Sequence, residues 1–367
     1  MFFRAIIAAG LLCLSLPQLA NAEDILYGSY VGPNHGHNVY GLKRFFDDAT
    51  KQDPDLKFKL VPGGALVGAK TTLAGVRDGV VDGGLIVSLY HTNDLPYNAV
   101  IADMAAWTGR AAVNAGAVNE TTLLDCPGCM KEWEKWNIKH LGAYASTPYA
   151  VICRVPVKSL ADLKGKKIRG AGALGRWITA LGGVPVNATI SEVYEGLQRG
   201  QLDCTVGSPG MMKSFSFWDV AKYILDVPSG GYLGGSMINM NLDRWKGLSD
   251  AAKKAYIHAA AAGVRGSTID GYRGDDLRAE AQFKERGITM TEPTADVVAM
   301  LDKHRKAEIA VVIATAKKRG VENPEAIVNA YLKNIAKWNK IVDKIGPDDG
   351  DAFEAALRTE IYDKVKF

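Results

Sequence analysis

The chain has 367 residues, of which 47% are hydrophobic, 23% charged and 8% aromatic. This balance is typical of folded globular proteins and excludes disordered and fibrous classes. Its 44 Lys and Arg and 40 Asp and Glu give a formal net charge of +4, which is too small to indicate a nucleic-acid partner. A chain of this length favours two domains or lobes over a single core.

Residues 1–22 have the features of a secretory signal peptide. Arg4 gives a positive start, residues 5–16 are almost wholly apolar, and residues 20–22 offer small side chains for cleavage before Glu23. The apolar run is too short to cross a bilayer. We therefore expect export to the periplasm as a soluble protein whose mature chain begins at Glu23.

The first part of the mature chain alternates short apolar strands with amphipathic helices. The pattern predicts strands over 25–30, 56–61 and 83–89 and helices over 38–50 and 71–77. Units of this kind favour α/β architecture with parallel strands and right-handed crossovers.

Four cysteines remain after removal of the signal peptide, in a compartment that permits disulfides. Cys126 and Cys129 form a C-x-x-C just before a predicted helix. The pair is either a structural disulfide that closes a short loop or a redox pair of thioredoxin type; we favour the first because the chain is far longer than a thioredoxin domain. Cys153 and Cys204 lie in apolar, strand-like runs and are expected to be buried thiols.

A second α/β unit repeats the plan of the first. It comprises predicted strands over 166–169, 185–186 and 202–206, a loop and helix over 170–181 and a helix over 191–198. The segments 76–82 and 197–203 match in detail, since each ends a helix at glycine and places aspartate three residues later. Two similar lobes with a cleft between them are therefore predicted.

The second unit contains a run of glycines that suggests an alternative function. Gly170, Gly172 and Gly175 form a G-x-G-x-x-G between a strand and a helix, where a dinucleotide pyrophosphate would bind. An exported oxidoreductase using residues 170–175 or the Cys126/Cys129 pair is thus one alternative.

Arg169, just before the glycines, lies where open α/β sheets hold ligands and suits a carboxylate. Its other interpretation is a strand-end residue paired with a surface acid.

Beyond about residue 247 the chain is nearly all helical and is expected to brace the two lobes. Helices are predicted over 249–263, 267–286, 294–319 and 325–345. The sequence contains no strong catalytic motif, and His35 and His37 lack the Cys or carboxylate neighbours of a metal site. We expect no catalytic residues, no metal and no cofactor.

Three segments resemble a known family in order and spacing. Residues 158–169, 180–186 and 191–203 are similar to the DctP-type solute receptors of TRAP transporters, and a weaker likeness, including 62–66 and 217–223, covers the mature chain. The resemblance implies a two-lobed periplasmic binding protein of type II-like α/β fold with a long connecting helix and a helical C-terminal region. It divides the chain into a signal peptide (1–22), lobe I (23–148 with part of about 235–275) and lobe II (149–234 with part of about 276–367).

The function implied is that of an extracytoplasmic receptor that binds a small organic acid between the lobes. The receptor would act as a monomer and deliver its ligand to a sodium-coupled transporter, made of a small four-helix subunit and a large permease subunit in the membrane. A solute-binding protein of the ABC type is a further alternative.

By position, Arg169 resembles the family's carboxylate-binding arginine. Ser208 stands where the family often has asparagine, in a segment that departs from the usual pattern, and no second arginine is found near Tyr149, so sialic acid is not expected. The residues expected to bind ligand are Arg169, Tyr30, Ser88, Tyr90, Trp177, Ser208 and Asn239, with Trp107 and Phe215 as wall residues. If aromatic side chains line the cleft, a less polar or aromatic acid fits as well as a dicarboxylate.

Overall fold

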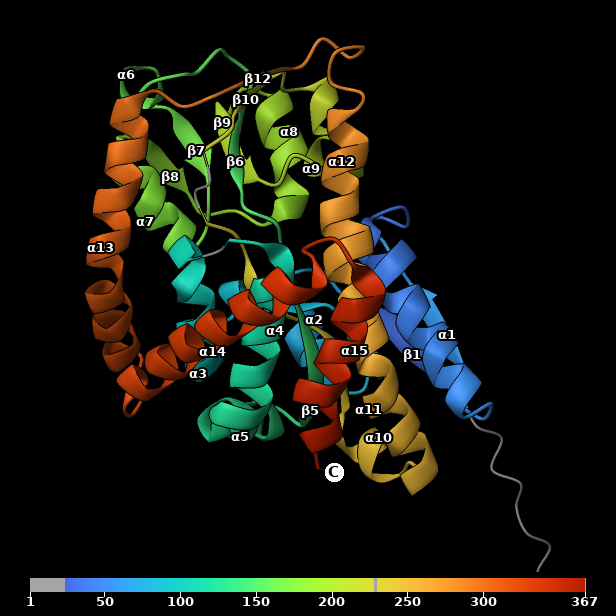
Figure 1. The fold of residues 1–367 in the computed structure, drawn as a ribbon. Helices are drawn as coiled ribbons and strands as arrows, with labels where there is room; N and C mark the ends of the chain where they lie inside the picture. The colour runs from blue at the N-terminus through green and yellow to red at the C-terminus, as the bar shows by residue number, and fades with distance from the viewer. Residues whose placement is uncertain (1–23, 108, 228–229, 367) are drawn as a thin grey trace, which may run out of the picture.

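The computed structural model describes residues 24–107, 109–227 and 230–366. It contains three sheets, with strand orders β2-β1-β3, β4-β11-β5 and β12-β10-β6-β9-β7-β8. The first two sheets and their helices make up one body, here called lobe I, and the six-stranded sheet makes up the other, lobe II (Figure 1). The predicted signal peptide lies outside the described residues.

Lobe I is built from strands of the N-terminal part of the chain and one strand that returns much later. Its strands are β1 (Ile25–Gly28), β2 (Phe58–Val61), β3 (Gly83–Gly84), β4 (Ile86–Val87), β5 (Ile138–Ala145) and β11 (Leu233–Asn241). Its helices are α1 (Lys43–Gln52), α2 (Thr72–Arg77), α3 (Pro96–Asp103), α4 (Ala111–Glu120), α5 (Pro127–Lys135), α10 (Leu242–Lys246) and α11 (Asp250–Arg265), with α14 (Pro324–Ile345) and α15 (Gly350–Glu360) packed on α4 and α11.

Lobe II repeats part of this plan. Its strands are β6 (Ala150–Cys153), β7 (Lys167–Arg169), β8 (Val184–Val186), β9 (Cys204–Gly207), β10 (Tyr223–Leu225) and β12 (Thr289–Thr291). Its helices are α6 (Leu160–Leu163), α7 (Ala173–Ala180), α8 (Val193–Gln198) and α9 (Met211–Ser214). In each lobe a central strand, β1 or β7, pairs in parallel with a strand on either side.

The pairing within the α/β units is parallel, as the pattern favours, whereas the strands next to the connections between the lobes pair antiparallel. β5 pairs antiparallel with β11, and β6 pairs antiparallel with β9 and β10. The segments β5–β6 and β10–β11 run from one lobe to the other in opposite directions, so the strands that they join lie antiparallel. The connections from β5 to β6 and from β10 to β11 therefore cross the lobe boundary.

Two helical segments also connect the lobes, one along each side of the molecule (Figure 1). One continues from α11 through the π-helical segment Gly266–Arg273 into α12 (Gly274–Glu280), and the other is α13 (Ala295–Lys318). The start of α13 is tied to lobe II, where Thr294 donates a hydrogen bond to the Lys158 carbonyl at 3.0 Å. Its later part packs on α3 of lobe I.

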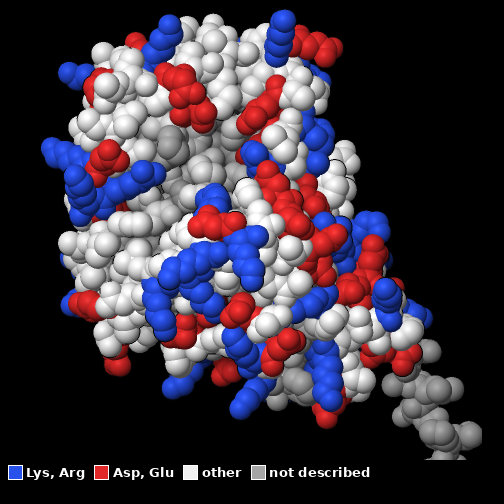
Figure 2. Space-filling view, in the orientation of Figure 1, with Lys and Arg blue, Asp and Glu red and all other residues white. Residues whose placement is uncertain are grey.

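The C-terminal segment is shared between the lobes. α14 and α15 pack against lobe I, and β12 and the first part of α13 lie with lobe II. The lobe boundaries near residue 148 stay a prediction. Lys and Arg side chains gather over α14, and a recess separates this surface from lobe II (Figure 2). No described helix is both long enough and apolar enough to cross a bilayer.

The matched segments 76–82 and 197–203 have the same structural role in the two lobes. Gly79 and Gly200 both have left-handed backbone, with φ of 74° and 72°, and each ends a helix. Three residues later, the carboxylate of Asp82 accepts a hydrogen bond from the Leu26 amide at 2.7 Å, and Asp203 accepts one from Lys167 at 2.8 Å. Each aspartate thus ties the helix–strand joint to the central strand of its own lobe.

Candidate functional site

Arg169 ends strand β7 and faces the boundary between the lobes. Its side chain is buried, with 4% of the residue exposed. Nε donates to the Ala188 carbonyl and Nη2 donates to the Tyr90 hydroxyl, both at 2.9 Å. No carboxylate among the described residues pairs with this guanidinium. The surface-acid interpretation therefore finds no ion pair, although Arg169 lies near enough to help lower the pKa of Glu192, after the hydrogen bonds from Thr189. The buried guanidinium is a cation that an anion would stabilise.

A cavity adjoins Arg169 and is lined from both lobes. The space in and around it that holds no protein atom is about 490 Å³. Aromatic rings dominate the lining. The lining residues are Arg169, Tyr30, Tyr90, Tyr144, Tyr149, Tyr232, Tyr272, Phe215 and His35, with the aliphatic residues Val31, Leu85, Val87, Leu89, Leu174, Ile190 and Met211.

Tyr90 joins the two lobes at one end of this cavity. Its hydroxyl, which belongs to lobe I, accepts hydrogen bonds from Arg169 Nη2 at 2.9 Å and from the Ile190 amide at 3.1 Å. Both donors belong to lobe II. Tyr90 therefore orients the guanidinium and holds the lobes together at the same point.

The rings pack against one another along the remaining wall. Tyr144 stacks on Tyr272 with centroids 5.2 Å apart, and His35 meets Phe215 edge to face at 5.1 Å. Burial raises the pKa of the tyrosine hydroxyls at Tyr30, Tyr144 and Tyr272 well above the usual value. These hydroxyls are therefore neutral at physiological pH, and each can donate or accept hydrogen bonds.

His35 adds a neutral polar group to this wall. The backbone amide of His37 donates to His35 Nδ1 at 3.1 Å, so Nδ1 carries the lone pair and the ring proton resides on Nε2. Burial lowers the pKa of His35 to about 4, because charging the ring inside the protein is costly. The arrangement of one cation among neutral rings can bind an anion with an apolar body.

Comparison with known proteins identifies the family to which this architecture belongs. The model of the bacterial extracellular solute-binding protein family 7 (DctP) matches residues 29–313. The chain belongs to this family. The predictions of a DctP-type receptor and a two-lobed α/β fold are thereby confirmed, and the match favours neither an oxidoreductase nor an ABC-type protein.

Its relatives bind different acids. The 2,3-diketo-L-gulonate-binding periplasmic protein YiaO of Escherichia coli is 25% identical over 264 residues, or 70% of this chain and 77% of the relative. The C4-dicarboxylate-binding periplasmic protein DctP of Rhodobacter capsulatus is 27% identical over 249 residues, covering 65% and 70%. A marine metagenome TRAP solute-binding protein specific for aromatic acids has a TM-score of 0.75 and 21% identity, covering 86% of this chain and 99% of its own.

Of the residues expected to bind ligand, the structure brings three to the cavity of this solute-binding protein. Tyr30, Tyr90 and Arg169 line it, as does Phe215, which was expected as a wall residue. Ser88 lies behind the wall, with its hydroxyl 3.3 Å from the hydroxyl of Tyr232. Trp107 is partly buried against the core and is absent from the lining.

Three other expected residues lie elsewhere, each for a structural reason. Asn239 is buried in β11, where its side chain exchanges hydrogen bonds with the amide and carbonyl of Gly84 at 3.0 and 2.8 Å and so joins β11 to β3. Trp177 points into the core of lobe II from the buried face of α7. Ser208 is buried, and two residues later the amide of Gly210 donates to the carboxylate of Asp276 on α12 at 2.6 Å.

Several tyrosines of the cavity wall were not predicted from the sequence. Tyr144 and Tyr232 lie on or next to the crossing strands β5 and β11, and Tyr272 lies on the connecting helix. In the sequence each is a single aromatic residue within an apolar or helical run, which is the ordinary pattern of a core residue. Their position could have been inferred from β5 and β11, because side chains next to the connections between the lobes lie close to the cleft.

The cysteines form two disulfides in the structure, Cys126–Cys129 and Cys153–Cys204. The first agrees with the favoured expectation and closes the turn before α5. The expectation that Cys153 and Cys204 are thiols is wrong. They lie opposite each other on the antiparallel strands β6 and β9, a register that the sequence does not reveal.

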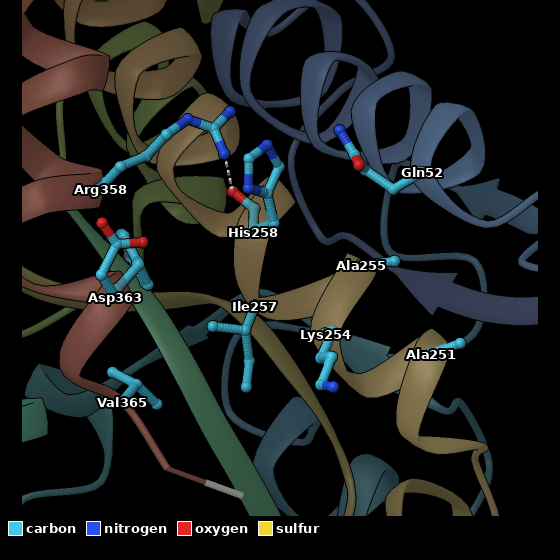
Figure 3. Close-up of a pocket in the computed structure, with 10 residues that line it drawn as sticks. Gln52, Ala251, Lys254, Ala255, Ile257, His258, Arg358, Asp363 and Val365 are labelled. Atoms are coloured by element: carbon cyan, nitrogen blue, oxygen red, sulfur yellow. Dashed lines mark hydrogen bonds between the residues drawn. The ribbon is translucent and has the colours of Figure 1, made fainter.

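In two other cavities the lining arginines are already paired. In lobe I, the pocket of Figure 3 contains Arg358, which donates to the carbonyl of His258 and to the carboxylates of Asp48 and Glu354. A groove on the recess side is lined by Arg110 and Arg273, and these pair with aspartates of the α14–α15 region. Within the described ranges no three His, Cys, Asp or Glu residues are placed to hold a metal.

Proposed function

We propose that this solute-binding protein binds a small organic acid that has one carboxylate and a ring, in the cavity between the lobes. The carboxylate would contact Arg169. The observation that carries this proposal is the buried guanidinium, which has hydrogen-bond donors to spare and no carboxylate partner in the described chain. A planar guanidinium suits a carboxylate because two parallel N–H donors match its two oxygens.

The lining of the cavity supports a ring as the body of the ligand. Phe215, Tyr30 and Tyr272 offer ring faces and edges, against which an aromatic or saturated ring would stack. A second carboxylate would have to lie against neutral rings and aliphatic side chains, where an unpaired charge is costly. We therefore favour a monocarboxylate over a C4-dicarboxylate.

Neutral polar groups in the wall support a hydroxyl or keto substituent on that ligand. His35 presents an N–H at Nε2, and the tyrosine hydroxyls can donate or accept. A solved protein of this fold is specific for aromatic acid ligands, which supports the idea that the fold can hold such acids. It does not select among them, because identity with this chain is 21%.

We further propose that the mature protein works in the periplasm as a monomer and passes its ligand to TRAP membrane subunits. The small four-helix subunit and the large sodium-coupled permease would recognise the closed, loaded form. The family match and the signal-peptide pattern of residues 1–22 support this assignment. Reconstitution of the permease with and without the receptor would test it, with acid uptake expected only when both are present.

The ligand class is tested by a thermal-shift screen of refolded, ligand-stripped mature protein. The panel contains 3-hydroxybenzoate, mandelate, benzoate and pyroglutamate as ring acids, with succinate and malate as dicarboxylates. A ligand at about 100 times its Kd stabilises the fold by about 2.7 kcal/mol, so binding is easily seen. Ring acids are expected to raise the melting temperature most. A shift with succinate alone would overturn the proposed class.

A further inference from the structure

A second arginine, the half-buried Arg176, connects the lobes away from the ligand cavity. It lies on α7 of lobe II, and its Nη1 reaches the carboxylate of Asp103 on α3 of lobe I at 3.4 Å. Its Nε donates to the carboxylate of Glu308 on α13 at 2.5 Å. One guanidinium therefore joins a helix of lobe II to lobe I and to the helix that runs beside both (Figure 1).

The two carboxylates are deeply buried, whereas the arginine is not. The side chains of Asp103 and Glu308 are 2% and 3% exposed, and that of Arg176 is 26% exposed. Asp103 also pairs with Arg319 at 2.6 Å, so it keeps one cation if Arg176 moves away. Among the described residues, Glu308 pairs besides only with His304, at 3.6 Å. Burial lowers the pKa of His304, so that this ring stays neutral near pH 7 and does not replace the lost charge.

Separation of the lobes would thus leave Glu308 with poorer compensation. Breaking a buried pair by removing one partner is strongly unfavourable, because the remaining charge is uncompensated. Arg176, being more exposed, would be solvated by water when it leaves. The pair therefore biases the protein towards the state in which α7 lies against α3 and α13.

The same helix also forms part of the ligand cavity. Leu174, two residues before Arg176, lines the cavity. Gly172, just before the helix, lies against Leu89 of lobe I so closely that a Cβ atom would stand 2.3 Å from the Leu89 Cδ1. Movement of α7 away from lobe I would therefore open the cavity wall and break the Arg176 contacts together.

We propose that Arg176 is a latch that stabilises the closed arrangement of the lobes through Asp103 and Glu308, and that it raises ligand affinity without touching the ligand. The inference rests on the proposed function in one respect, namely that the acid binds between the lobes. A protein that is only partly in its competent state binds with an affinity reduced by that fraction. Loss of the latch should therefore weaken binding through the lobe equilibrium.

The test compares Arg176→Met with Glu308→Gln and a matched control, Arg358→Met. Arg358 is similarly buried, with 20% of its side chain exposed, and pairs with two carboxylates, but all of its partners lie in lobe I. Two readouts are used on the mature protein: the radius of gyration from small-angle scattering without ligand, and the Kd for 3-hydroxybenzoate from calorimetry. Glu308→Gln keeps the side-chain shape, so it serves if Arg176→Met folds poorly.

Arg176→Met and Glu308→Gln are expected to have a larger radius of gyration than the wild type and a Kd raised about 10-fold. The double variant should be no worse than Arg176→Met alone, since Arg176→Met already removes the contacts of the guanidinium with both Asp103 and Glu308. The control should match the wild type in both readouts. Unchanged scattering in Arg176→Met and Glu308→Gln, or an equal change in Arg358→Met, would overturn the latch. If 3-hydroxybenzoate binds no form, the proposed ligand class fails, while the scattering still decides the latch.

Discussion

Replacement of Arg169 by methionine separates the binding role of this residue from a structural one. The variant removes the only cation that lines the cavity while keeping a side chain of similar length. Two of the five N–H groups of Arg169 are used by Ala188 and Tyr90, which leaves donors on Nη1 and Nη2 for a bidentate carboxylate. Two such charge-assisted bonds are worth about 1.5–3 kcal/mol each. The Kd should therefore rise at least about 100-fold.

The same variant should have little effect on the stability of the ligand-free fold. It loses the two hydrogen bonds of Arg169, but it also removes a buried charge that has no acidic partner. These effects oppose each other, so the free energy of unfolding should change by no more than about 1 kcal/mol. Arg358→Met should behave in the opposite way, because Arg358 compensates Asp48 and Glu354. That variant should lose stability and keep its affinity.

Calorimetric titration measures the first effect, with 3-hydroxybenzoate or the acid of the panel that gives the largest shift. Urea unfolding of the ligand-free proteins measures the second. Arg169→Lys is a useful third variant, since it keeps the charge but not the planar fork, and should fall between the wild type and methionine. A Kd for Arg169→Met within about threefold of the wild type would refute the assignment of this residue to the ligand.

Three further outcomes are expected. Tyr90→Phe removes the acceptor shared by Arg169 and Ile190, and should raise the Kd about 10-fold in calorimetry; an unchanged Kd would show that Tyr90 does not orient the guanidinium. Replacing Cys153 and Cys204 by alanine opens a loop of about 50 residues and should lower the free energy of unfolding, measured with urea, by about 4 kcal/mol. Replacing Cys126 and Cys129 opens a much shorter loop and should lower it by about 2 kcal/mol. Equal losses would contradict the dependence on loop length. Burial raises the pKa of Asp276 from 3.8 to about 7, so its contribution to stability is fully present below the ordinary value and is lost as the pH rises through 7. Asp276→Asn should flatten the fall in melting temperature between about pH 4 and 7, and an unaltered slope would exclude Asp276 as its source.

Short-range patterns made the fold predictable. Helix ends at Gly79 and Gly200, each followed by an aspartate that binds β1 or β7, are local features that depend on a few neighbouring residues. These patterns predict the two α/β units, and the one around Gly200 lies within a segment, 191–203, that resembles the DctP family. The sequence predicts separate helices over 249–263 and 267–286, whereas the structure joins them through the π-helical segment Gly266–Arg273. Gly263 and Gly266 suggest a helix end because glycine has a low helix propensity, but packing keeps this segment helical.

In the candidate site, Arg169 is the residue whose role the sequence indicates most directly. Arg169 is a charged residue at the end of an apolar strand, and that contradiction between type and place is visible in the sequence. Tyr144 and Asn239 show no such contradiction. Which one faces the cavity and which one joins two strands is decided by the register of β5 on β11, with its three irregularities. Register of this kind depends on contacts about 100 residues apart, which no local pattern encodes.

The glycine run after Arg169 shows how one spacing can serve two purposes. In a dinucleotide-binding protein the glycines allow the backbone to approach a pyrophosphate. Here the partner is protein: Gly172, with φ of 56°, lies against Leu89 of the opposite lobe, and Gly170 lies against Ile178 of its own helix. A side chain at Gly172 would keep α7 from lobe I. The glycines therefore allow α7 to reach the opposite lobe, so that Arg169 at one end of this turn can bind a ligand while Arg176 beyond the other holds the lobes together.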